Sequence, residues 1–168
     1  MNIKVILICA IIFLISLTRL FPHPPNFTPI LALAIFGGAY FPNRIFAITL
    51  PVIAMFLSDL IIGFHSQIYA VYGTIIALSL LGNMVKTKNI KNLAITGFSG
   101  SIIFFVTTNF SVWLSDGLYP LTFDGLIQSY VMAIPFFHNT LISTLLFLSI
   151  LFFGYTFAEK KFKVLKKI

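Results

Sequence analysis

The segment Pro29-Ile-Leu-Ala-Leu-Ala-Ile-Phe-Gly-Gly-Ala-Tyr-Phe41 decides the fold, because whether it crosses a membrane sets the side on which every other loop lies. It is short for a crossing, since a transmembrane helix usually needs about 20 residues. It nevertheless has helix boundary signals: Thr28 as a candidate N-cap, Pro29 at the first helical position and Pro42 beyond the end. The charge pattern of the chain favours a short crossing.

Five further runs are long and apolar enough to be membrane segments: roughly Val5–Leu20, Ile45–Phe64, Ile68–Val85, Leu93–Leu114 and Phe136–Phe157. If all six segments cross, ten of the eleven basic residues lie on one side and only Arg19 lies on the other. If the second segment did not cross, Lys4 and Arg44 would lie opposite the Lys86–Lys91 loop and the lysine-rich tail. In the arrangement with six crossings, the positive-inside bias makes the basic side cytoplasmic.

Composition excludes an ordinary soluble domain, because the mean hydropathy is +1.04 and only 9% of the 168 residues are charged. We expect one transmembrane domain over residues 1–168: an all-α, compact six-helix bundle of the inner (plasma) membrane with both termini in the cytoplasm. The net charge of +7 lies in loops and the tail. Anionic lipid headgroups explain it better than nucleic acid.

Apolar residues recur at helical spacing between Leu121 and Ile134, with Asp124 and Gln128 elsewhere on the helix. This pattern predicts an outer interfacial helix at about 122–134. We expect it to be separate from the sixth crossing, because a helix continued through Pro135 would be too long for one crossing.

Small residues at Ala34 and Gly38 are four apart in the second segment, a spacing that lets helices approach closely in lipid. Internal packing of the bundle is the favoured explanation. The alternative is a docking face for another membrane subunit.

The loop from Arg19 to Pro29 combines rigid prolines with the polar side chains of His23 and Asn26. We expect it to contact a ligand as a stiff lid, although a plain connector is the alternative. Arg19 and Asp59 should lie at similar depths near the outer interface, where charges are costly unless paired. An ion pair between them is expected, and it serves either to pin two helices or to bind substrate.

Further polar and aromatic residues lie near the outer helix ends, namely His65, Asn109, Trp113, His138 and Asn139. Amides and imidazoles form directional hydrogen bonds, while aromatic rings offer flat surfaces, so the mixture suits a small heteroaromatic or polar ligand. The three histidines show no i, i+3 or i+4 spacing. We therefore expect no metal site, no cofactor and no catalytic residues.

Two specific strings, His23-Pro-Pro-Asn-Phe-Thr-Pro29 and Ile134-Pro-Phe-Phe-His-Asn-Thr140, resemble those of a family of small bacterial membrane proteins of unassigned function. More distantly, the size, the six helices and the outer polar cluster resemble the substrate-binding S components of energy-coupling factor (ECF) transporters. That resemblance implies a vitamin or micronutrient bound near the outer face, and docking to a membrane coupling subunit with separate ATPases.

The leading hypothesis is thus a membrane-embedded substrate-binding subunit of a micronutrient importer, whose partners are the lipid bilayer, a small molecule and that coupling module. The expected ligand-binding residues are His23, Asn26, Asp59, His65, Asn109, Trp113, His138 and Asn139. Two alternatives remain open. One is an integral-membrane enzyme that uses outward histidine and aspartate groups; the other is a non-catalytic assembly subunit.

Overall fold

The computed structural model describes residues 3–41, 43–83, 85 and 89–162. This part of the chain is helical and contains no strand. Its elements are α1 (Ile3–Ser16), the 3₁₀ helix η1 (Leu17–Leu20), α2 (Ile30–Tyr40), α3 (Arg44–Ile62), α4 (Ile68–Gly82), α5 (Ile90–Ser115) and α6 (Phe123–Lys161). The expected all-α fold with six α-helices is confirmed.

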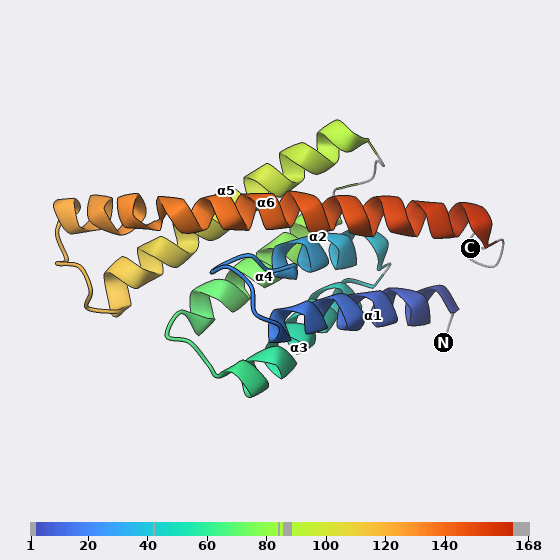
Figure 1. Ribbon diagram of the computed structural model, residues 1–168, viewed down its shortest axis with the longest axis horizontal. Helices are drawn as coiled ribbons and strands as arrows, with labels where there is room; N and C mark the ends of the chain where they lie inside the picture. Colours follow the sequence, from blue (N-terminus) through green and yellow to red (C-terminus); the bar gives the residue numbers. More distant parts are fainter. Residues whose placement is uncertain (1–2, 42, 84, 86–88, 163–168) are drawn as a thin grey trace.

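Successive helices run in opposite directions, so the chain passes back and forth between two ends of an elongated bundle (Figure 1). The start of α1 and the end of α6 lie together, with Lys4 Nζ 3.5 Å from Glu159 Oε1. α3 and α5 also start toward this end (Figure 1). The helix directions therefore agree with the alternation inferred from the charges. Pro42 and the lysines at 86, 88, 163, 166 and 167 lie outside the described residues.

Four helices are long and apolar enough to cross a membrane: α1 continued by η1, α3, α5 and α6. The helices α2 and α4 are also apolar but shorter. The chain is therefore a membrane protein.

The short helix α2 lies at the centre of the bundle and contacts all five other α-helices. Every residue from Ile30 to Gly38 is buried, which explains why the segment has no polar face. Its 11 residues rise about 16 Å, well short of a hydrocarbon core of about 30 Å. The helix begins one residue later than expected, with Pro29 at the N-cap and no side-chain cap from Thr28.

The helices α2 and α4 meet backbone to backbone at Gly38 and Gly82. A Cβ added to Gly38 would lie 2.0 Å from Ser79 O, and one added to Gly82 would lie 2.3 Å from Ile35 O. Ala34 is also fully buried. The docking face considered for Ala34 and Gly38 is therefore wrong, because internal packing occupies both residues.

The helix α6 is continuous over 39 residues, so the expectation of a separate interfacial helix at 122–134 is wrong. The helix does start where expected, with Thr122 Oγ1 accepting a hydrogen bond from Gly125 N at 3.2 Å. It then continues through Pro135. Its length of about 58 Å exceeds one hydrocarbon thickness at any usual tilt, so part of α6 extends beyond the apolar layer.

Packing against α5 explains why Pro135 does not end the helix. The ring of Phe105 contacts Tyr130 before the proline and Phe137 after it, with ring centroids 5.6 and 5.0 Å apart. Tyr130 also donates a hydrogen bond to Val106 O at 3.0 Å. Contacts on both sides of Pro135 hold the two halves of α6 along one neighbouring helix.

The outer half of α6 turns small residues inward. Gly125, Ser129 and Ala133 are buried, whereas Ile127 and Val131 are exposed. Phe123, Ile127, Val131 and Ile134 of the apolar stripe therefore face away from the bundle, whereas Tyr130 packs against α5.

Candidate functional site

A cavity of about 540 Å³ lies toward the end of the bundle opposite the termini. The cavity is partly open. It is lined by η1 and the loop after it, the α3–α4 connection, the second half of α5, the α5–α6 connection and the first half of α6, with further residues from α2, α3 and α4. Its polar lining residues include Arg19, His23, Asn26, Thr28, His65, Gln67, Thr108, Asn109, Ser129 and Thr140. Its aromatic lining residues are Phe104, Phe105, Tyr119, Phe136 and Phe137.

Four of the eight expected ligand-binding residues line this cavity: His23, Asn26, His65 and Asn109. They come from the first outer loop, the α3–α4 connection and α5, so three distant parts of the sequence meet there. Asn109 Nδ2 donates a hydrogen bond to Phe105 O at 2.7 Å, which leaves the amide oxygen available as an acceptor.

The first outer loop has a defined shape. Asn26 lies in the left-handed region at φ 61°, which asparagine tolerates better than most residues. Phe27 N donates to Pro24 O at 3.0 Å, closing a turn. His23 Nδ1 is 2.7 Å from Phe21 O, so this nitrogen is engaged within the loop and Nε2 remains for other contacts.

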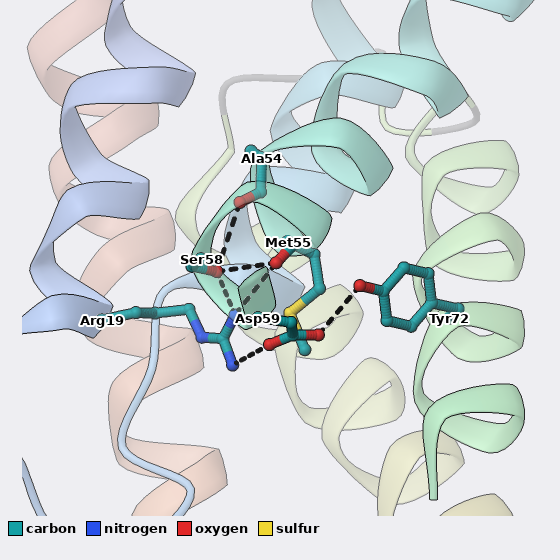
Figure 2. Close-up of polar contacts among 6 residues, drawn as sticks. All are labelled: Arg19, Ala54, Met55, Ser58, Asp59 and Tyr72. Carbon is teal, nitrogen blue, oxygen red and sulfur yellow. Dashed lines mark hydrogen bonds and ion pairs between the residues drawn. The ribbon is translucent and has the colours of Figure 1, made fainter. Parts of the chain in front are cut away.

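The expected ion pair between Arg19 and Asp59 is present beside the cavity (Figure 2). Arg19 Nη2 is 3.0 Å from Asp59 Oδ1, while Nη1 donates to Ser58 Oγ and to Met55 O. Tyr72 OH donates to Asp59 Oδ2 at 2.8 Å. The network joins η1, α3 and α4, so it fixes the position of Arg19 relative to two helices.

Arg19 and Asp59 differ in their relation to the cavity. Arg19 is a lining residue, whereas Asp59 is not. The Asp59 side chain is only 1% exposed. The structure thus places the aspartate behind the arginine, and Asp59 itself does not line the expected ligand site.

Three other expected residues also lie outside the cavity lining. Trp113 Nε1 donates to Pro120 O at 3.0 Å and thereby closes the α5–α6 connection. Asn139 Nδ2 donates to Pro25 O at 2.9 Å and ties α6 to the first outer loop. His138 is exposed. The structure gives Trp113 and Asn139 positioning contacts in place of the expected direct ones.

The structure adds lining residues that the sequence analysis missed. Gln67 precedes α4, donates from Nε2 to Asp116 Oδ1, and has a buried Oε1 without a hydrogen-bond partner in the described chain. Ser129 and Thr140 line the cavity from α6. Thr108 also lines the cavity, and its position next to Asn109 in the sequence was a usable signal for it. No signal in the sequence pointed to Gln67.

The described residues contain no group of three or more histidine, cysteine, aspartate or glutamate side chains that could hold a metal ion. His23 and His65 line the same cavity. Their side chains lie among amides and aromatic rings in the lining.

Fold and site together define a class: a small helical membrane protein with a polar and aromatic cavity toward one end of its bundle. The chain matches the model of the family of unknown function DUF6580 over residues 1–165 and belongs to that family. No curated protein matches the chain, and no solved structure matches it.

Proposed function

We propose that the chain is a substrate-binding subunit of a small-molecule importer in the bacterial inner (plasma) membrane, comparable in role to ECF S components. The observation that carries the proposal is the cavity of about 540 Å³, whose size lies within the usual range for ligand sites. Its lining mixes aromatic rings with amides and imidazoles, a combination that suits a vitamin-like heteroaromatic molecule.

The first outer loop supports this function. It contributes His23, Pro25, Asn26 and Thr28 to the lining, and Asn139 of α6 holds it through Pro25 O. The proline-rich loop would close over the ligand after it enters. In this proposal a separate coupling subunit with ATPases supplies the energy for import.

Small molecules retained by the gently purified protein test the proposal, with mass spectrometry as the measurement. We expect a retained compound in the native protein and a strong decrease in the Asn109→Ala variant. Loss of a directional hydrogen bond in a partly dry cavity typically costs about 1–3 kcal/mol. That cost corresponds to roughly 5- to 150-fold weaker binding.

The His138→Ala variant is the matched control, because His138 is exposed and lies outside the lining. It should retain the compound as the native protein does. Equal retention by the Asn109→Ala and His138→Ala variants would remove the cavity as the binding site. Release of a chemically altered molecule would instead support the alternative of a membrane enzyme.

A further inference from the structure

In the part of the chain that the structure describes, the cavity lining contains charge of one sign only, although Asp59 lies directly behind it. Among the described residues that line it, Arg19 is the single permanently charged side chain, and no aspartate or glutamate is present. The histidines at 23 and 65 add hydrogen-bonding groups without negative charge. The lining therefore contains the positive partner of the Arg19–Asp59 ion pair and not the negative one.

We infer that the ligand carries an acidic group, a carboxylate or a phosphate, which faces Arg19; this inference rests on the proposed function. A guanidinium presents N–H groups in a planar fork that matches the oxygens of either anion. The rest of the ligand lies against the aromatic rings contributed by α5 and α6.

The arrangement of Arg19 supports this inference. Its side chain is only 10% exposed, and Ser58, Asp59 and the Met55 carbonyl hold the two terminal nitrogens. Its Nε is buried and has no hydrogen-bond partner in the described chain, so it is not the group that a ligand meets. Nη1 donates to Met55 O and Ser58 Oγ, and Nη2 faces Asp59 Oδ1. Since each terminal nitrogen has two N–H groups, one N–H of Nη2 is left for a ligand anion.

Asp59 balances the charge of Arg19 and orients the ion pair, with the guanidinium toward the cavity. The carboxylate lies behind Arg19, with Oδ1 facing the guanidinium and Oδ2 accepting from Tyr72 OH. It is nearly unexposed and lies outside the lining. A ligand therefore meets the positive end of this pair first. A cationic ligand would lose its hydration and find no counter-charge there, which is costly in a partly dry site.

The opposite polarity is available away from Arg19. The Asn109 amide oxygen is left as an acceptor because Nδ2 binds Phe105 O, and Asn109 lines the cavity. It fits an N–H or O–H group on the body of an acidic ligand.

Matched compound sets test the inference by affinity-selection mass spectrometry on the purified full-length protein. Each set contains an aromatic carboxylic acid, its primary amide and the corresponding amine, with bicyclic bodies small enough for the cavity. We expect the acids to bind at least about tenfold more tightly than their amides, and the amines to bind most weakly. A charge-assisted contact is stronger than a neutral one.

The double variant Arg19→Gln/Asp59→Asn removes both charges and keeps the protein neutral at this position. It should stay folded, still bind the amides and lose the preference for acids. The His138→Gln variant should keep that preference. Binding of amides or amines as tightly as acids by the native protein would overturn the inference and leave the proposed function standing. If the native protein bound no compound and retained no molecule on purification, the proposed function itself would fail.

Discussion

An alanine at Gly38 is expected to reduce the free energy of unfolding by at least about 3 kcal/mol, the upper part of the usual range for overpacking. The added Cβ would lie 2.0 Å from Ser79 O and 2.9 Å from Gly82 Cα. Both are backbone atoms, so no side-chain rotation relieves the overlap and α2 must move away from α4. Because α2 contacts every other α-helix, its displacement disturbs the whole core. Thermal unfolding of the purified protein in one detergent measures the loss.

Gly73→Ala is the matched control within α4, since an added Cβ there has no neighbour within 4 Å. Alanine is favoured over glycine inside a helix by up to about 1 kcal/mol. The Gly73→Ala protein should therefore unfold at the native temperature or slightly above it. Equal stabilities of the two variants would contradict the close approach of α2 and α4.

The sequence predicted the number and direction of the helices well, because charge parity and apolar runs respond directly to the bilayer. It predicted a short helix near Pro29–Phe41, and the structure explains the length by burying α2 from Ile30 to Gly38. The sequence could not choose between internal packing and docking for Ala34 and Gly38. Small residues at this spacing fit both functions equally well. Only the structure, which places Gly82 of α4 against Gly38, decides for internal packing.

The continuity of α6 was not predictable from its own residues. Pro135 lacks an N–H group and usually ends or bends a helix, and 39 residues exceed one crossing. The deciding contact comes from Phe105 on another helix, which bridges both sides of the proline. A pattern within one segment contains no information about such a neighbour.

Half of the expected ligand-binding residues lie in the cavity lining. His23, Asn26, His65 and Asn109 line the cavity, because the loops and the helix end that carry them meet at one end of the bundle. Sequence alone could not place His138, which is exposed, since residues near a membrane surface can face water in any direction.

The second large effect is expected for Asp59→Ala, which should lower the free energy of unfolding by roughly 3–5 kcal/mol. The Asp59 side chain is 1% exposed and that of Arg19 is 10% exposed. Removing the carboxylate leaves a buried guanidinium without a counter-charge and Tyr72 OH without its acceptor. Unfolding in the same detergent as for Gly38→Ala gives the value.

Asp124→Ala is the control for this measurement, because Asp124 is an exposed aspartate in the first turn of α6. Its loss should cost no more than about 1 kcal/mol through the helix dipole. The neutral double variant Arg19→Gln/Asp59→Asn should be more stable than Asp59→Ala, because it removes the uncompensated charge while keeping hydrogen-bonding groups at both positions. A double variant as unstable as Asp59→Ala would show that the charges themselves do not matter. The loss would then come from packing around η1, α3 and α4, and the pair would have no electrostatic role in holding Arg19 at the cavity.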